Sequence, residues 1–223
     1  MSFLWFVAVP YLAIVMAIMV GIYRYYNDRF SYSTLSSQFL EKRALFWGSV
    51  PWHYGVILVL LAHLLAFIVP GFWQDLIANE TRLYVLEVTG IALALLAVFG
   101  LTVLIVRRMT NPKAFINATG WDWLLLVALL VQVGLGFYVA LFYRWGSDWF
   151  LHTASPWLVS LLKFQPETRY VTALPLPIQI HMVGGFILLG ILSFTRLVHV
   201  LAFPVTYLWR PYQVVIFNRR PTR

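Results

Sequence analysis

Five long apolar runs, separated by short polar segments, limit what this chain can fold into. They cover residues about 3–26, 44–69, 83–106, 121–143 and 177–203. Each run exceeds the roughly 20 residues that an α-helix needs to cross the hydrocarbon core of a bilayer. The chain is 61% hydrophobic and 11% charged, whereas soluble domains are about 25% charged. We therefore expect an all-α integral membrane protein, a single domain over residues 1–223 with five transmembrane helices.

The distribution of positive charge predicts how these helices are oriented. An N-terminus outside the cell places eleven cations in the inner segments: Arg24, Arg29, Lys42, Arg43, Arg107, Arg108, Lys113, Arg210, Arg219, Arg220 and Arg223. The outer segments then hold four: Arg82, Arg144, Lys163 and Arg169. Cytoplasmic loops of membrane proteins carry an excess of Lys and Arg. We therefore expect the N-terminus outside and the C-terminus in the cytoplasm, and the net charge of +8 requires no nucleic acid partner.

Four of the five histidines lie within the apolar runs, and two runs contain all four. His53 and His63 belong to the second run, His181 and His199 to the fifth. Ionisable side chains inside a membrane span are unfavourable and usually functional. Because the two runs are antiparallel, His53 pairs with His199 near the inner face, and His63 pairs with His181 near the outer face. Neutral imidazole is a good iron ligand, so we interpret the pairs as axial ligands of two stacked haems between the second and fifth helices.

The spacings within the two runs are unequal. The eighteen residues from His181 to His199 make five turns of a continuous helix, which puts both rings on one face about 27 Å apart. The ten residues from His53 to His63 rise only about 15 Å and fall about 80° short of three turns. Helix tilt and slanted ligation would have to absorb this difference. The alternative is four histidines that hydrogen-bond to the backbone or to each other.

Small and charged residues near the histidines are further candidates for the haem sites. Arg196, three residues before His199, is a cation within the span. A haem propionate would neutralise it, unless the side chain snorkels to the inner surface. Four glycines near the histidines leave room for a flat macrocycle, unless they serve close packing between helices; they are Gly55, Gly184, Gly185 and Gly190.

Arg82 comes just before the start of the third predicted helix, and Glu87 lies in its first turns, near the outer face. With His63 and His181, they are predicted to frame a quinol pocket. In this pocket Arg82 orients a quinone oxygen, while a carboxylate or a histidine accepts protons. The alternative is a surface ion pair or a solvated helix end.

Three further expectations concern the rest of the chain. Asp122 follows Thr119-Gly120 and should cap the start of the fourth helix. His152, in an outer loop, should be a surface histidine. Residues 157–162 are apolar but too short to span, and we expect them on the membrane surface.

Two stretches carry a resemblance to a known family. One is Ser36-Ser-Gln-Phe-Leu-Glu-Lys-Arg43 in the first inner loop. The other is Arg196-Leu-Val-His199 followed by Pro204-Val-Thr-Tyr-Leu-Trp-Arg-Pro-Tyr-Gln213. Together with the histidine spacings, they make the whole chain resemble the gamma subunit of membrane-bound respiratory nitrate reductase, the dihaem cytochrome b that anchors that enzyme.

The resemblance implies a multi-pass protein of the cytoplasmic (inner) membrane with two haem b groups. It implies that His53 and His199 bind the inner haem, His63 and His181 the outer haem, and that menaquinol or ubiquinol is oxidised near the outer one. Electrons would pass to an iron–sulfur (beta) subunit and then to a molybdenum-containing (alpha) subunit that reduces nitrate. The chain has no cysteine, consistent with iron–sulfur clusters on a partner. A family lysine involved in quinol binding falls at Arg82, which keeps the charge but changes its shape.

Three other functions fit parts of the sequence. A dihaem anchor of another quinol-linked oxidoreductase, of the heterodisulfide or sulfite-reduction type, would share the histidines but not the two stretches. A transporter that uses the histidines as a proton relay would be colourless and would carry more intramembrane carboxylates than Glu87. A membrane metal hydrolase or desaturase is disfavoured because there is no His-Glu-x-x-His motif and the histidines are dispersed.

Overall fold

A computed structural model of the chain describes residues 1–27 and 43–200. All regular secondary structure in these residues is helical, as the sequence predicts. Most of the inner-loop stretch 36–43 and the whole tail stretch 204–213 lie outside the described residues, together with the basic C-terminal residues.

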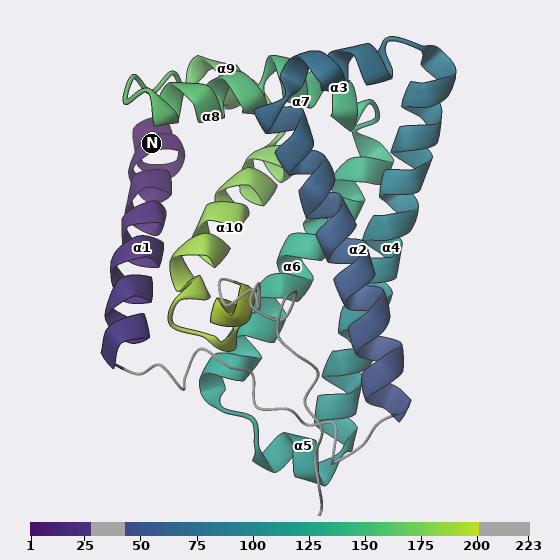
Figure 1. Cartoon of the computed structure of the whole chain (residues 1–223), viewed down its shortest axis with the longest axis vertical. Helices are drawn as coiled ribbons and strands as arrows, with labels where there is room; N and C mark the ends of the chain where they lie inside the picture. The colour runs from purple at the N-terminus through teal and green to yellow at the C-terminus, as the bar shows by residue number, and fades with distance from the viewer. Residues whose placement is uncertain (28–42, 201–223) are drawn as a thin grey trace, which may run out of the picture.

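Five helices run along the long axis of the molecule and alternate in direction (Figure 1). They are α1 (Val9–Asn27, preceded by the π-helix Leu4–Ala8), α2 (Arg43–Ile68), α4 (Glu80–Thr110), α6 (Gly120–Phe142) and α10 (Leu176–Leu192). In the described part of the chain, four of them are long and apolar enough to cross a membrane, and α10 is shorter. Its 17 residues measure about 25 Å, against about 30 Å for the hydrocarbon core.

The fifth predicted helix, residues 177–203, is not continuous. α10 ends at Leu192, and a 3-10 helix (Arg196–Val200) follows after residues 193–195. This 3-10 helix turns toward α6 instead of continuing the line of α10 (Figure 1). The expectation of five unbroken turns between the two histidines of this segment is therefore wrong.

Side-chain hydrogen bonds explain the break. The hydroxyl of Ser193 donates to the backbone oxygen of Ala17 in α1 at 2.8 Å. The hydroxyl of Thr195 donates to the backbone oxygen of Leu192 at 3.2 Å. Ser and Thr hydroxyls that bond to nearby backbone groups compete with the helical ladder, and here one of them also ties the break to a neighbouring helix.

The long helices form an open row rather than a closed bundle. α2 packs on α4, α4 on α6, α6 on α10, and α10 on α1, while α2 and α10 are not among the closely packed pairs of described helices. The contact between α2 and α4 depends on two glycines. A Cβ on Gly55 would lie 2.7 Å from the backbone oxygen of Leu93, and one on Gly100 would lie 2.3 Å from the backbone nitrogen of Trp52. These glycines let the two backbones approach closely.

Short helices lie across the end of the row that holds the N-terminus (Figure 1). They are α3 (Pro70–Ile77), α7 (Gly146–His152), α8 (Ala154–Leu162) and α9 (Arg169–Thr172). Residues 157–162, predicted to lie on the membrane surface, belong to α8, whose crosswise orientation is consistent with that expectation. The opposite end carries only the short α5 (Pro112–Ile116) among the described helices.

Trp157 attaches this end layer to the first long helix. The side chain is 1% exposed, and its Nε1 donates to the backbone oxygen of Phe6 at 3.0 Å. Four residues after Phe6, Pro10 has no N–H to offer to that oxygen. Pro10 therefore follows the π-helical segment and leaves a carbonyl available for a tertiary contact.

Most of the long-helix surface faces outward. Between 11% and 28% of the residues in the most apolar windows of the four long helices are buried inside the protein. Large apolar side chains such as Leu12, Ile57, Leu95 and Val127 are exposed. An apolar surface this extensive needs lipid or a partner protein to cover it, so the chain is a multi-pass membrane protein.

Candidate functional site

The structure brings the rings of His53 in α2 and His199 in the 3-10 helix close together in an edge-on arrangement. Their ring centroids lie 6.4 Å apart, and the ring planes are inclined by 62°. Imidazole nitrogens bond a first-row metal ion at about 2 Å, so two imidazoles on opposite sides of one ion have centroids about 6 Å apart. The observed separation therefore fits two axial ligands of a single iron.

The Nδ1 atoms of the four histidines of the apolar runs lie within hydrogen-bond distance of a backbone oxygen. The partners are Ser49 for His53 (2.7 Å), Val59 for His63 (2.8 Å), Gln132 for His181 (3.1 Å) and Arg196 for His199 (2.7 Å). A ring that donates from Nδ1 presents an unprotonated Nε2, which is how metal-ligating histidines are usually held. The histidines were alternatively expected only to hydrogen-bond to the backbone or to each other, and the structure shows such bonds for Nδ1. Among the described residues, none of the four Nε2 atoms has a hydrogen bond.

His181 is held by α6, which carries none of the four histidines. The Gln132 side-chain nitrogen donates to the backbone oxygen of His181 at 2.9 Å and lies 3.2 Å from its Nδ1. A Cβ on Gly136 would lie 2.8 Å from Cε1 of the His181 ring. The ring of His63 meets that of Phe150 in α7 edge-on, with centroids 5.6 Å apart.

The four glycines predicted to leave room for a macrocycle are in contact with protein atoms instead. Gly55 packs on α4, as described above. A Cβ on Gly184 would lie 2.3 Å from the side-chain oxygen of Gln132, and one on Gly185 would lie 3.6 Å from its nitrogen. A Cβ on Gly190 would lie 3.4 Å from Cα of Ala13 in α1. These contacts support the alternative of close packing between helices.

Arg196 has a protein partner. Its Nε lies 2.9 Å from Oδ1 of Asp122, and Arg108 lies 3.7 Å from the other oxygen of the same carboxylate. Asp122 is 4% exposed and forms a capping box with Thr119, so the predicted cap is confirmed. Two arginines share one carboxylate and leave a net charge of about +1 at this spot, so contact between Arg196 and a haem propionate stays a prediction.

The two residues predicted to frame the quinol pocket have different partners. Arg82 donates to the backbone oxygen of Asp75 in α3 at 3.0 Å. Glu87 accepts from the backbone nitrogen of Ser147, at the start of α7, at 2.8 Å. Five positions on a helix place side chains about 140° apart, which explains why the two diverge. Glu87 alone is linked to the surroundings of His63, because α7 also carries the ring packed on that histidine.

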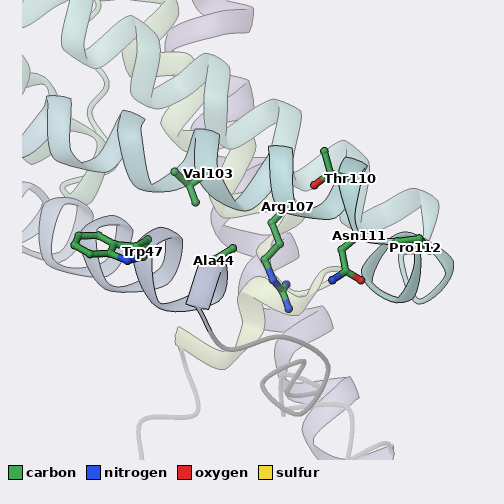
Figure 2. A pocket seen from close by; sticks show the side chains of 7 residues that line it. All are labelled: Ala44, Trp47, Val103, Arg107, Thr110, Asn111 and Pro112. Atoms are coloured by element: carbon green, nitrogen blue, oxygen red, sulfur yellow. The ribbon is translucent and has the colours of Figure 1, made fainter.

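A groove of about 590 Å³ lies at the far end of α4 from Arg82 and Glu87. Its lining residues are Ala44, Trp47, Val103, Arg107, Thr110, Asn111 and Pro112 (Figure 2). Figure 2 shows the Arg107 side chain between Ala44 and Asn111. The groove is therefore distinct from the predicted quinol pocket.

The described residues that could bind a metal ion are histidines in pairs, not in larger groups of ligands. Within residues 1–27 and 43–200, no group of three or more His, Cys, Asp or Glu side chains converges on one point. His152 is exposed, 3.9 Å from Asp148, as expected of a surface histidine. A haem needs only one or two protein ligands, since its own ring supplies the others, so the donor set fits haem.

Sequence reasoning missed Gln132, Gly136 and Phe150. Gln132 gave a detectable signal, because it is the only amide side chain in the apolar run 121–143. Nothing in the sequence distinguishes Gly136 from the neighbouring Gly134, and Phe150 is one of 17 phenylalanines.

The fold and the site together define a class: a multi-pass helical membrane protein in which two antiparallel apolar segments carry two histidines each. The chain belongs to the nitrate reductase gamma subunit family, whose model matches residues 2–218. It is 31% identical over 215 residues to the nitrate reductase gamma chain of Bacillus subtilis, a match that covers 95% of each chain. The family resemblance seen in the sequence is therefore confirmed.

Two further relatives extend this comparison. The chain is 26% identical over 211 residues to the respiratory nitrate reductase 1 gamma chain of Escherichia coli, covering 92% of this chain and 93% of that one. It is 32% identical over 226 residues to the nitrate reductase-like protein NarX of Mycobacterium tuberculosis, covering 99% of this chain and 34% of NarX. The similarity thus extends over nearly the whole chain in each case.

Proposed function

We propose that this chain is the cytochrome b subunit of a nitrate reductase complex. It oxidises membrane quinol near the outer face and delivers the electrons to a cytoplasmic iron–sulfur (beta) subunit. That subunit supplies a molybdenum-containing (alpha) subunit, which reduces nitrate. The observation that carries the proposal is the close pair His53 and His199, with ring centroids 6.4 Å apart and both Nδ1 atoms bonded to backbone oxygens.

Four histidines would hold the haems in this proposal. His53 and His199 would ligate the inner haem b, and His63 and His181 the outer one. When bound, the two haems supply one-electron carriers between the faces of the membrane. A ring that donates its Nδ1 proton to the backbone oxygen would leave Nε2 free to bind the iron.

We also propose that α10 and the 3-10 helix together make a fifth crossing of the inner membrane, with the N-terminus outside. Five crossings agree with the alternating directions of α1, α2, α4, α6 and α10 (Figure 1). The excess of Lys and Arg in the segments assigned to the inside supports this orientation.

Quinol, either menaquinol or ubiquinol, would bind near His63 at the end of the row that carries the short helices. Glu87 supports this location because its carboxylate is bonded to the start of α7, whose Phe150 packs on the His63 ring. A carboxylate there can accept a proton from quinol as it is oxidised. Arg82, on another side of α4, would contribute positive charge at the entrance rather than share the pocket with Glu87.

The test is to purify the full chain with and without its partner subunits and measure haem by pyridine haemochrome. We expect about two b-type haems per chain, reduction by quinol, and reoxidation by nitrate only with the partners present. Reduction by quinol without reoxidation by nitrate in the assembled complex would favour the anchor of another oxidoreductase. A chain without haem, from cells with ample haem supply, would refute the proposal and favour the histidine-relay transporter.

A further inference from the structure

We infer that Asp122 and Arg24 are positioning residues for His199: they hold the break in the fifth helical segment from two sides and so direct the His199 ring at His53. The inference rests on the proposed function, in which His199 ligates the inner haem. Neither residue contacts the histidine itself, and each acts through the segment that carries it.

The first side of the break is held by α1. Ser193 is 0% exposed and Thr195 is 3% exposed, so the irregular backbone here is buried. Within a membrane, such backbone is tolerated only where the protein satisfies its polar groups. Arg24 does this, because its NH1 donates to the backbone oxygens of Ser193 at 2.8 Å and Thr195 at 3.1 Å. With the bond from Ser193 to Ala17, α1 fixes where α10 ends and where the chain turns.

The second side is held by α6 and α4. Arg196, the first residue of the 3-10 helix, is bound through Nε to the buried Asp122. Asp122 is in turn fixed by its capping box with Thr119 and by its neighbour Arg108. Removing one partner of a buried ion pair leaves an uncompensated charge and is strongly destabilising. The start of the 3-10 helix is thereby fastened to the first turn of α6.

Arg196 connects this anchor to the histidine. Its side chain binds Asp122, while its backbone oxygen accepts from Nδ1 of His199 at 2.7 Å. The same residue therefore fixes the place of the segment and the orientation of the ring. An unbroken helix would carry His199 further along the line of α10, whereas the observed turn brings its ring to 6.4 Å from that of His53.

The first experiment compares Asp122→Asn with Asp122→Glu in the full chain assembled with its partners. Asparagine keeps an oxygen that can accept from the Thr119 backbone nitrogen but removes the charge that binds Arg196. We expect Asp122→Asn to lose at least half of the inner haem and to change the electron paramagnetic resonance signal of the remainder. Asp122→Glu should recover most of the wild-type haem content. The outer haem, assigned by comparison with His63→Ala, should be unchanged in both.

Glu167→Gln is the matched control, because Glu167 is an exposed carboxylate paired with Arg169 in the layer of short helices. It should leave both haem signals as in the wild type. An Asp122→Asn chain with normal content and signal of the inner haem would overturn the inference. Equal loss of both haems would also overturn it, because it would reveal a general folding role.

The second experiment needs no haem. Amide hydrogen exchange of residues 193–200 is measured in chains made by haem-deficient cells, for the wild type, Asp122→Asn and Arg24→Gln. We expect exchange at least tenfold faster in both variants and unchanged in Glu167→Gln; equal exchange in all four would refute the anchoring. If the wild type binds no haem in any preparation, the proposed function fails, while this measurement still decides whether the two residues hold the segment.

Discussion

The ring of His181 lies against Gly136 of α6 so closely that a Cβ on that glycine would come within 2.8 Å of Cε1. The same helix supplies a backbone oxygen for Nδ1 of the ring, at Gln132. A helix that carries none of these four histidines therefore sets the position of one of them. Supporting contacts of this kind commonly influence metal affinity by about tenfold or more.

Gly136→Ala should displace the His181 ring and weaken the outer haem site. The added methyl meets a ring atom that is itself held by α6, so neither side can move without loss of a contact. We expect a lower content of outer haem, or a changed paramagnetic resonance signal from it, with the inner haem intact. Pyridine haemochrome assays combined with redox titration of the purified complex would measure this.

Gly134→Ala is the control on the same helix, because a Cβ there meets nothing within 4 Å. Its spectrum and haem content should match those of the wild type. If Gly136→Ala and Gly134→Ala had the same haem content and spectrum, contact with Gly136 would not be what positions His181.

Alanine substitutions of the four histidines should divide them into two pairs. His53→Ala and His199→Ala should each remove the inner haem, since their rings lie 6.4 Å apart. His63→Ala and His181→Ala should each remove the outer haem. Redox titration of each variant would show which of the two b-type signals is lost.

The pairing would be contradicted by His53→Ala and His181→Ala losing the same signal. Equal loss of both haems from every variant would show that the histidines act on the fold as a whole. His152→Ala is the control, because this exposed histidine should leave both signals in place.

Much of the fold could be predicted because bilayer thickness dictates helix length. The first four apolar runs match the observed long helices to within about four residues at each end. The cap at Asp122 could be predicted because its signal, Thr119 followed by a carboxylate three residues later, is local in sequence. The histidines in apolar runs predict a functional role because such side chains are unfavourable in lipid, and that role stays a prediction.

The fifth helix could not be predicted because its end depends on tertiary contacts. Residues 177–203 are apolar enough for one helix, and only the partners of Ser193 in α1 and of Arg196 in α6 reveal the break. The four glycines near the histidines were misinterpreted for the same reason. Their sequence spacing does not say whether a haem macrocycle or a neighbouring helix lies against them. The pairing of Asp122 with Arg196 joins two parts of the chain that no local pattern connects.

Gly55→Ala should destabilise the contact between α2 and α4. The new Cβ would lie 2.7 Å from backbone atoms of Leu93 and Ala97, and backbone cannot swing aside as a flexible side chain does. Forcing extra volume into such a contact costs about 1–3 kcal/mol. The free energy of unfolding in mixed detergent micelles would measure the loss.

Gly90→Ala on α4 is the matched control, because nothing lies within 4 Å of its added Cβ. Alanine favours a helix over glycine by up to about 1 kcal/mol, so this variant should be as stable as the wild type or slightly more so. Equal destabilisation by both substitutions would show that the close approach of α2 and α4 is not what Gly55 provides.

Glu87→Gln should slow quinol oxidation without moving α7. Glutamine keeps a side-chain oxygen that can accept from the Ser147 backbone nitrogen, where Glu87 now accepts at 2.8 Å, but it cannot take a proton. General base catalysis contributes about 10²–10⁴-fold to rates, so we expect at least about a hundredfold slower reduction of the haems by quinol. Stopped-flow spectroscopy of the purified complex would record it, with haem content and spectrum unchanged.

Two comparisons distinguish proton transfer from a merely structural role of Glu87. Glu87→Ala removes the bond to α7 as well and should also disturb the signal of the outer haem, since Phe150 of that helix packs on His63. Asp148→Asn changes a carboxylate that belongs to α7 itself and is exposed to solvent, and it should leave the rate as it is. A Glu87→Gln complex with wild-type rates would show that another group accepts the quinol protons.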